Sequence, residues 1–323
     1  MTEPTPAPAD ADDALLRLAA AVRDAGYRFV TATPATHARV NARPGNAWAR
    51  GLEDVFGWSR PFRPEILPPA VFELMRLAGV AAPYGEGGDG WRSLVRLSSL
   101  GGELFLHSAF PTAEADAVFF GPDTYRFASA IEAHLETRAA PVRRAVDIGC
   151  GAGPGGILVA KARPGAEVSM GDINDAALRF ARINAALAGA GNAVARRSDL
   201  LAGVPGDPFD LVVANPPYLV DPAERAYRHG GGPLGAGLSL TILDAALGRL
   251  APGGTLLLYT GAAVVNGHDP FRAEAEERLA AHSGVGWTYR EVDPDVFGEE
   301  LDTAAYAEAD RIAAVVLTVT RKG

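Results

Sequence analysis

The second half of this chain alternates between short apolar runs, which are typical of strands, and amphipathic segments, which are typical of helices. The alternation predicts an α/β fold with a parallel sheet, because each parallel strand needs a helical crossover before the next one. The expected strands are 142–148, 167–171, 193–197, 209–214, 255–260, 286–292 and 312–320. The expected helices are 154–163, 175–187, 238–250 and 271–282. An acid-rich segment separates the last two strands and is expected to be a solvated loop; it contains Glu299, Glu300 and Asp302.

The first half of the chain is less regular, and the pattern breaks between residues 120 and 140. Its first thirteen residues are rich in Pro, Ala and Asp and lack the basic start of a signal peptide, which predicts a disordered tail. Helices are expected at 14–25 and in part of 63–77, followed by a two-stranded hairpin over 91–107. A helix pair followed by a hairpin is typical of a winged-helix-like domain. We therefore expect a tail (1–13), a smaller N-terminal accessory domain for substrate recognition (14–120) and a second domain (121–323).

Composition and charge exclude several classes of site. The 323 residues include one cysteine, Cys150, so an intrachain disulfide and a cysteine zinc cluster are excluded. The six histidines are scattered without metal-ligand spacing, and we expect no bound metal. No apolar run approaches the roughly 20 residues that span a bilayer, so we expect a cytoplasmic protein with no membrane partner. The net charge of −9 disfavours a general nucleic-acid binder.

One segment departs from that charge balance. Residues 28–63 contain six arginines and two acids, Glu53 and Asp54. Two interpretations are open, a local nucleic-acid face and ordinary surface charge.

A glycine-rich loop directly follows the first expected strand and precedes its helix. Its sequence is Asp147-Ile-Gly-Cys-Gly-Ala-Gly153. The glycines at 149, 151 and 153 allow a tight turn and a close approach of the backbone to a ligand. The spacing differs from the Gly-x-Gly-x-x-Gly pattern that cradles a pyrophosphate, and Asp147 is placed for a cationic amino-acid group. Cys150 is expected to fill space in the loop rather than to react.

A second motif, Asn215-Pro-Pro-Tyr218, follows the apolar strand 209–214. Pro216 and Pro217 stiffen the loop. The Asn215 side chain and the Pro216 carbonyl can accept the two hydrogens of an –NH2 group, which directs the nitrogen lone pair outward, and Tyr218 can stack on the planar group behind it. Positioning and aimed dipoles then supply catalysis. The alternative is a structural turn that ends the strand.

Together the two motifs resemble class I S-adenosylmethionine-dependent methyltransferases. The resemblance runs from about residue 122 to the C-terminus and implies a Rossmann-like, seven-stranded sheet with one antiparallel edge strand. The Asn-Pro-Pro-Tyr motif resembles that of the release-factor glutamine methyltransferase and small-domain methyltransferase group, which implies transfer to a planar amino or amide nitrogen. The implied cofactor is S-adenosylmethionine. Its implied contacts are Asp147 and the glycines 149, 151 and 153, Asp172 and Ile173 at the ribose, Asp199 and Leu200 at the adenine, and Asn215 beside the methyl group.

The segment 121–127 before the first strand also resembles the part of release-factor glutamine methyltransferases that covers the cofactor. This similarity implies cofactor contacts by Asp123 and Thr124, although Pro122 stands where that family has an acid. A helix N-cap at Asp123 is the alternative.

The glycine-rich stretch that begins at Tyr227 resembles the segment after the catalytic motif in the same enzymes. Arg228 and His229 within it are candidates for substrate contact, and a mobile loop explains them equally well.

The sequence leaves two substrates open. The additional segments favour the glutamine side chain of a protein, of the release-factor type. The N-terminal region with its arginines favours an exocyclic amine of an RNA base, in rRNA or tRNA. A small-molecule amine is not excluded, whereas the intact chemical motif disfavours a non-catalytic binding module. The oligomeric state is not readable.

Overall fold

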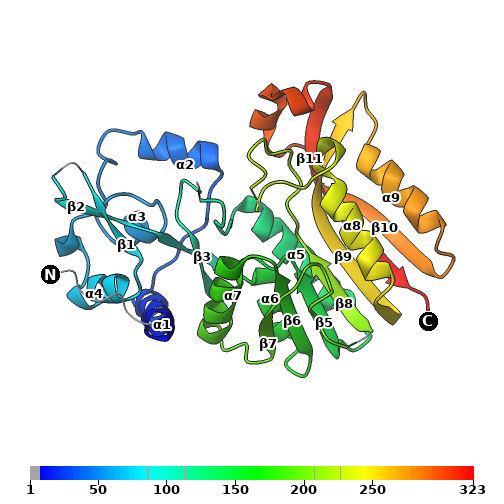
Figure 1. Cartoon of the computed structure of the whole chain (residues 1–323), viewed down its shortest axis with the longest axis horizontal. Helices are drawn as coiled ribbons and strands as arrows, with labels where there is room; N and C mark the ends of the chain where they lie inside the picture. Colours follow the sequence, from blue (N-terminus) through cyan, green and yellow to red (C-terminus); the bar gives the residue numbers. More distant parts are fainter. Residues whose placement is uncertain (1–7, 86, 113, 207, 226) are drawn as a thin grey trace.

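The computed structural model describes residues 8–85, 87–112, 114–206, 208–225 and 227–323. Among these residues, seven strands form one sheet in the order β10-β11-β9-β8-β5-β6-β7 (Figure 1). Their bounds are β5 Arg144–Ile148, β6 Glu167–Asp172, β7 Ala193–Arg197, β8 Phe209–Ala214, β9 Leu250–Val265, β10 Val285–Asp293 and β11 Ala309–Arg321. The expected Rossmann-like α/β sheet is therefore present.

Helices cover both faces of this sheet because its central strands are apolar on both sides. In β8, Leu211 and Val213 join the hydrophobic cluster on one face, whereas Val212 and Ala214 join the cluster on the other. Successive side chains of a strand point to opposite faces, which explains the alternation. The covering helices are α5 Pro122–Thr137, α6 Pro154–Ala162 and α7 Asp175–Leu187 on the first face, and α8 Gly237–Leu247 and α9 Pro270–Ala280 on the second.

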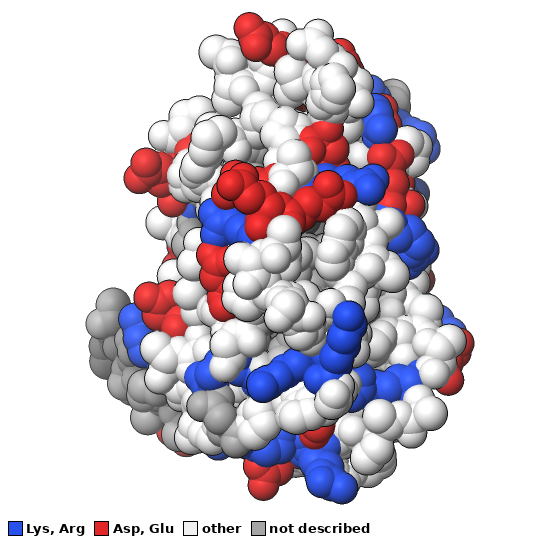
Figure 2. Space-filling model, turned by 90° about the vertical axis from the view of Figure 1, so that its right-hand side faces the viewer, with Lys and Arg blue, Asp and Glu red and all other residues white. Residues whose placement is uncertain are grey.

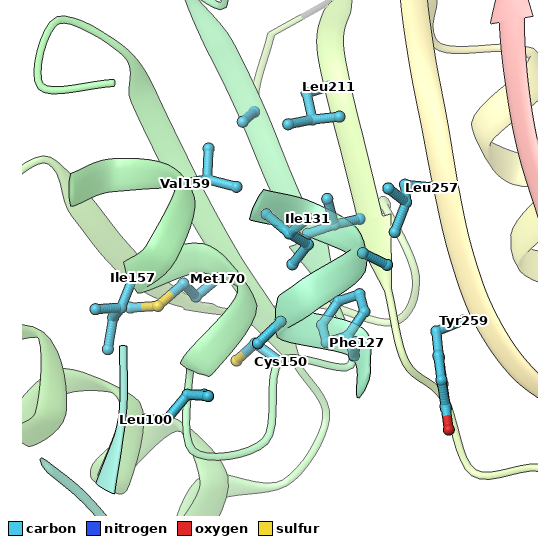
Figure 3. Packing of buried hydrophobic residues seen from close by; sticks show 14 of the residues in the cluster. Leu100, Phe127, Ile131, Cys150, Ile157, Val159, Met170, Leu211, Leu257 and Tyr259 are labelled. Atoms are coloured by element: carbon cyan, nitrogen blue, oxygen red, sulfur yellow. The ribbon is translucent and has the colours of Figure 1, made fainter. Parts of the chain in front are cut away.

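The packing of the first face is shown in Figure 3. Phe127 and Ile131 from α5 lie between α6 and the sheet residues Leu211 and Leu257. Cys150 is buried in the same cluster, in agreement with its expected role as a small filling residue.

The single antiparallel strand does not lie at the edge, which corrects the expectation from the resemblance. β11 lies between β9 and β10 and pairs antiparallel with both. Six consecutive residues of β11 are buried, whereas β10 has a partly exposed pattern. The apolar run 312–317 therefore gains more burial inside the sheet than at its edge, and β10 takes the edge position.

The helix expected at 238–250 is shorter, and the following strand is longer. α8 ends at Leu247, and β9 already begins at Leu250, which pairs with Phe209 of β8. The Pro252-Gly253-Gly254 sequence lies within β9 rather than at a helix end. Pairing of Leu250 with β8 outweighs the local helix preference there.

The N-terminal region consists of short elements. Its helices are α1 Pro8–Asp24, α2 Pro34–Asn41, α3 Leu52–Phe56, η1 Pro64–Ile66 and α4 Pro69–Leu77. Two antiparallel pairs follow, β1 Ala81–Tyr84 with β2 Gly90–Ser93, and β3 Val95–Leu100 with β4 Glu103–Ser108. The expected hairpin is thus present as β3–β4, but the residues from Trp91 to Ser93 pair with β1 instead.

The expected disordered tail of residues 1–13 is wrong for residues 8–13, which form the start of α1. Composition predicts a tail here because it contains no information on tertiary contacts. In the structure, Asp12 forms an ion pair with Arg179 of α7, and α1 packs on α7 (Figure 1). Residues 1–7 lie outside the described residues.

The core of the N-terminal region is continuous with α7. Leu15, Phe56 and Leu106 belong to one cluster with Phe180 and Ile183 of α7. Other residues of α7, Ala181 and Ala185, face the sheet. α7 is therefore buried on two sides, and a winged-helix-like assignment of the region stays a prediction.

The segment between β10 and β11 is not a solvated loop throughout. It contains two short 3-10 helices, η3 Gly298–Asp302 and η4 Ala304–Tyr306. Glu300 is buried and forms an ion pair with Arg228. Tyr306 is also buried, and its hydroxyl accepts a hydrogen bond from Val220 N (3.0 Å). Acidic composition alone could not reveal Arg228, the ion-pair partner of Glu300, which lies 72 residues upstream. No helix in the described parts of the chain is long and apolar enough to cross a bilayer.

Candidate active site

A cavity of about 220 Å³ lies at the carboxyl ends of β5, β6 and β8. In parallel sheets this edge is where ligands bind, because the loops after neighbouring strands converge there. The sequence-predicted residues that line it are Asp123, Thr124, Asp147, Gly149, Gly151, Asp172, Ile173, Asp199, Leu200, Asn215, Pro216, Pro217 and Tyr218. The fold thus brings together all the residues predicted for catalysis and cofactor binding except Gly153, whereas the candidate substrate contact His229 does not line the cavity.

The glycine loop between β5 and α6 forms part of the cavity wall. Gly149 has φ +65° and Gly151 has φ +54°, which L side chains rarely adopt. A Cβ on Gly149 would meet nothing within 4 Å, so it would project into open space beside the cavity. The absent side chains leave room for a ligand against the backbone.

Gly153, which is expected from the sequence to contact the cofactor, has a packing role in the structure. Its φ is +86° and it precedes α6 as the N-cap residue. A Cβ there would lie 3.0 Å from Met170 Sδ and 3.2 Å from Ala181 Cβ. Gly153 therefore permits close packing of α6 against β6 and α7, and it does not line the cavity.

Asp147 is the penultimate residue of β5 and is almost fully buried. Its Oδ2 accepts a hydrogen bond from Gly156 N (2.8 Å). Burial raises the pKa of this carboxyl to about 7, and the nearby Asp172 contributes in the same direction. A cationic group in the cavity would offset that desolvation, which fits the ammonium of S-adenosylmethionine.

Asp172 ends β6, and its two oxygens are held by the backbone. Oδ2 accepts from Gly151 N and Oδ1 from Asn174 N, both at 2.9 Å. Burial raises its pKa as well. Beside it Ile173 is 54% exposed and lines the cavity. An exposed apolar side chain next to a held carboxylate fits a sugar joined to a planar base, so the residues present fit the cofactor.

The Asn215-Pro-Pro-Tyr motif follows β8, which lies between β5 and β9 at the centre of the sheet. Asn215 is half-buried, and its side chain makes no hydrogen bond to another described residue. Its amide oxygen is therefore available to a ligand in the cavity.

Tyr218 is enclosed more by protein than the sequence indicated. A Cβ on Gly261 would lie 2.3 Å from Tyr218 Cδ2, so the ring packs on the Gly261 backbone. Phe297 makes an edge contact with the ring, at 5.9 Å between centroids. Burial, and then the neighbouring Asp123 carboxylate, raise the pKa of Tyr218. Its stacking on a substrate stays a prediction.

Asp123 and Thr124 lie in the first turn of α5. The N-cap of this helix is Gly121, not Asp123, and Thr124 Oγ1 accepts from Gly121 N at 3.2 Å. The Asp123 carboxylate accepts a hydrogen bond from Tyr259 OH (2.6 Å). These protein partners account for both side chains, and their contact with the cofactor stays a prediction.

Arg228 and His229 are held by neighbours within the protein. Arg228 lines the cavity and forms an ion pair with Glu300. His229 Nδ1 accepts a hydrogen bond from Asp221 N at 3.2 Å. Neither has the geometry of a free catalytic base.

Sequence reasoning did not single out Phe119, Tyr227 and Phe297, which are three of the aromatic residues that line the cavity. They come from three separate segments, and Tyr227 OH donates to Thr112 O (2.7 Å) of the N-terminal region. No local pattern marks them, apart from the position of Tyr227 beside the glycine-rich stretch. The described residues contain no group of three or more His, Cys, Asp or Glu side chains arranged to hold a metal ion.

Comparison with known proteins agrees with this geometry. The family described as methyltransferase small domain matches residues 120–264. The chain is similar to the release factor glutamine methyltransferase of Deinococcus radiodurans, with 35% identity over 64% of this chain and 72% of that protein. The chain belongs to this family of S-adenosylmethionine-dependent methyltransferases.

Two relatives from Bordetella pertussis differ in what their names say they act on. The release factor glutamine methyltransferase is 34% identical over 58% of this chain and 68% of that protein. The ribosomal protein uL3 glutamine methyltransferase is 36% identical over 37% of this chain and 44% of that protein. This methyltransferase is therefore an N-methyltransferase with S-adenosylmethionine as its cofactor, and its substrate is a separate question.

Proposed function

We propose that this methyltransferase transfers a methyl group to the side-chain amide nitrogen of a protein glutamine. The observation that carries the proposal is the position of Asn215, whose side chain lies on the cavity wall at the end of β8 and makes no hydrogen bond to another described residue. The names of the relatives, which include a release factor and a ribosomal protein as substrates, support the same assignment.

Asn215 and Pro216 orient the substrate amide. Asn215 Oδ1 and the Pro216 carbonyl accept its two N–H hydrogens, which turns the nitrogen lone pair toward the cofactor. When bound, S-adenosylmethionine supplies an electrophilic methyl group and leaves as a neutral thioether. The two oxygens stabilise the positive charge that develops on nitrogen. The nitrogen then loses a proton to water, so no strong base is needed in the protein.

The charges around the cavity favour a peptide over a nucleic acid. The charged side chains of its wall are Asp123, Asp147, Asp172, Asp199 and Arg228. The single arginine is already paired with Glu300. Phosphates need uncompensated cations, and these carboxylates would repel them.

The outer surface carries both basic and acidic side chains on the face that Figure 2 shows. Lys and Arg side chains form a band across its lower part, with Asp and Glu side chains gathered above them. This face does not present one continuous basic field.

Three of the six arginines of residues 28–63 form ion pairs with acidic residues of the N-terminal region. Arg60 is buried against Asp54, and Arg63 pairs with Asp89. Arg50 also pairs with Asp54. Three of the six arginines therefore form internal or surface ion pairs. Ordinary structural roles explain these three.

The substrate that we propose more specifically is a glutamine of a release factor. The match covers 72% and 68% of the length of two release factor glutamine methyltransferases, but 44% of the uL3 glutamine methyltransferase. A release-factor substrate places the enzyme in the cytoplasm. The uL3 type and an RNA base are the competing outcomes.

Labelled cofactor and cell extract test the proposal, with and without ribonuclease. We expect label on a protein, resistant to ribonuclease, and N-methylglutamine in its peptide by mass spectrometry. The same protein with the target glutamine changed to glutamate is the substrate control, and it should stay unlabelled. Label that disappears with ribonuclease would establish the RNA alternative instead.

A further inference from the structure

Asn184 lies in the last turn of α7. Asparagine is unfavourable inside helices because its amide competes with the backbone for hydrogen bonds. This side chain is fully buried, on a helix that faces both the sheet and the N-terminal region. A buried amide needs partners, so its contacts show why it is there.

Two of its hydrogen bonds go to strand β4 of the N-terminal region. Leu106 N donates to Asn184 Oδ1 at 2.8 Å, and Asn184 Nδ2 donates to Leu106 O at 2.9 Å. β4 pairs with β3 in a two-stranded sheet, so its other edge would otherwise leave these groups unpaired. The Asn184 amide satisfies both, as a neighbouring strand would.

The third hydrogen bond goes to the cofactor loop. Asn184 Nδ2 also donates to Ala152 O at 2.9 Å. Ala152 lines the cavity next to Gly151, whose N–H donates to Asp172. A loop with several glycines at positive φ holds its shape poorly by itself, so contacts from outside must fix it.

We propose that Asn184 is a positioning residue that fixes the cofactor loop and fastens it to strand β4. It touches neither cofactor nor substrate and acts through the Ala152 carbonyl. The loop conformation needed for cofactor binding then depends on a correctly packed N-terminal region. This inference concerns only cofactor binding, so its test does not depend on whether the substrate is a protein glutamine.

Asn192 offers a matched control for a purely structural amide. Its Nδ2 also donates to backbone carbonyls, those of Ala160 (3.3 Å), Arg163 (3.2 Å) and Ala166 (3.0 Å). None of these three residues lines the cavity. Loss of this amide removes three hydrogen bonds, as many as at Asn184, without touching the cofactor loop.

The experiment compares Asn184→Leu with Asn192→Leu in the full-length enzyme, by calorimetric titration with S-adenosylmethionine and by steady-state kinetics. We expect the Kd of Asn184→Leu to rise about tenfold, the effect of one hydrogen bond to the loop. Its kcat at saturating cofactor should stay within about twofold of the wild type. Asn192→Leu should change Kd by less than about twofold. Asn184→Ser replaces Asn184→Leu if the latter does not fold.

Hydrogen exchange tests the connection to β4. In the wild type, cofactor should increase the protection of the Leu106 amide, and this increase should be lost in the Asn184 variant. Equal affinity losses in the two asparagine variants, or no cofactor-dependent protection at Leu106, overturn the proposal.

Discussion

The cluster under α8 and α9 and the cluster that fills the N-terminal region differ in where their residues come from. The first is built only from residues between Val146 and Val319. The second combines residues of α1, α3, α4 and the hairpins with Phe180 of α7 and Ala152 of the cofactor loop. The core under α8 and α9 therefore contains no residue of the N-terminal region. The core of the N-terminal region, in contrast, includes residues of α7, a helix that packs on the methyltransferase sheet.

This difference has a consequence for function. The chemical groups lie on the C-terminal half, but the wall that supports the cofactor loop is shared. A domain boundary near residue 120, which we propose from the sequence, separates two roles rather than two independent cores.

The largest expected effect concerns the chemistry of the C-terminal half. Asn215→Ala should lower kcat by about a thousandfold, since it removes one of the two acceptors that orient the substrate amide. Cofactor affinity should change little, because the expected contacts to the amino-acid group, ribose and adenine lie on other loops. Labelled transfer and calorimetry measure the two quantities. Retained turnover would show that Asn215 has no role in the chemical step.

The next effect addresses the shared core directly. Phe180→Ala should destabilise the protein by about 3 kcal/mol, because it leaves a cavity between α7 and the N-terminal region. Hydrogen exchange should then rise mainly in residues 8–108. Leu243→Ala, in the other cluster, is the control and should leave that region protected. The same exchange pattern in both variants would contradict the comparison of the two cores.

A smaller effect arises from the buried carboxylate of Asp147. Its pKa of about 7 in the free protein means that it is protonated below pH 7 and charged above it. Affinity for the cationic cofactor should therefore fall by up to about tenfold per pH unit below 7. Calorimetry between pH 6 and 8 measures this dependence. Asp147→Asn should bind weakly with a flatter profile, and an unchanged profile in that variant would assign the titration to another group.

The smallest effect concerns the start of α1. Asp12→Asn removes a partly exposed ion pair with Arg179, and should lower stability by less than about 1 kcal/mol. Thermal unfolding at low and high salt measures it, with high salt reducing the difference. A loss as large as that of Phe180→Ala would mean that charge, and not the apolar face, joins the two regions.

Much of the sheet and its motifs could be predicted because their signals are local. α7, β7 and β8 begin and end where the pattern of apolar residues placed them. The glycine loop and the Asn215 motif each follow a strand, and parallel strands end at one edge of a sheet. Their convergence on one cavity therefore followed from the sequence itself.

The tertiary structure decided what depends on partners far along the chain. The insertion of β11 inside the sheet, the burial of Glu300 and the positions of Phe119 and Phe297 in the cavity wall have no local signal. Asn184 is the clearest case, since its hydrogen bonds reach Leu106, 78 residues away, and Ala152, 32 residues away. A spacing pattern shows which face of a helix is apolar, but it cannot show which segment will lie against that face.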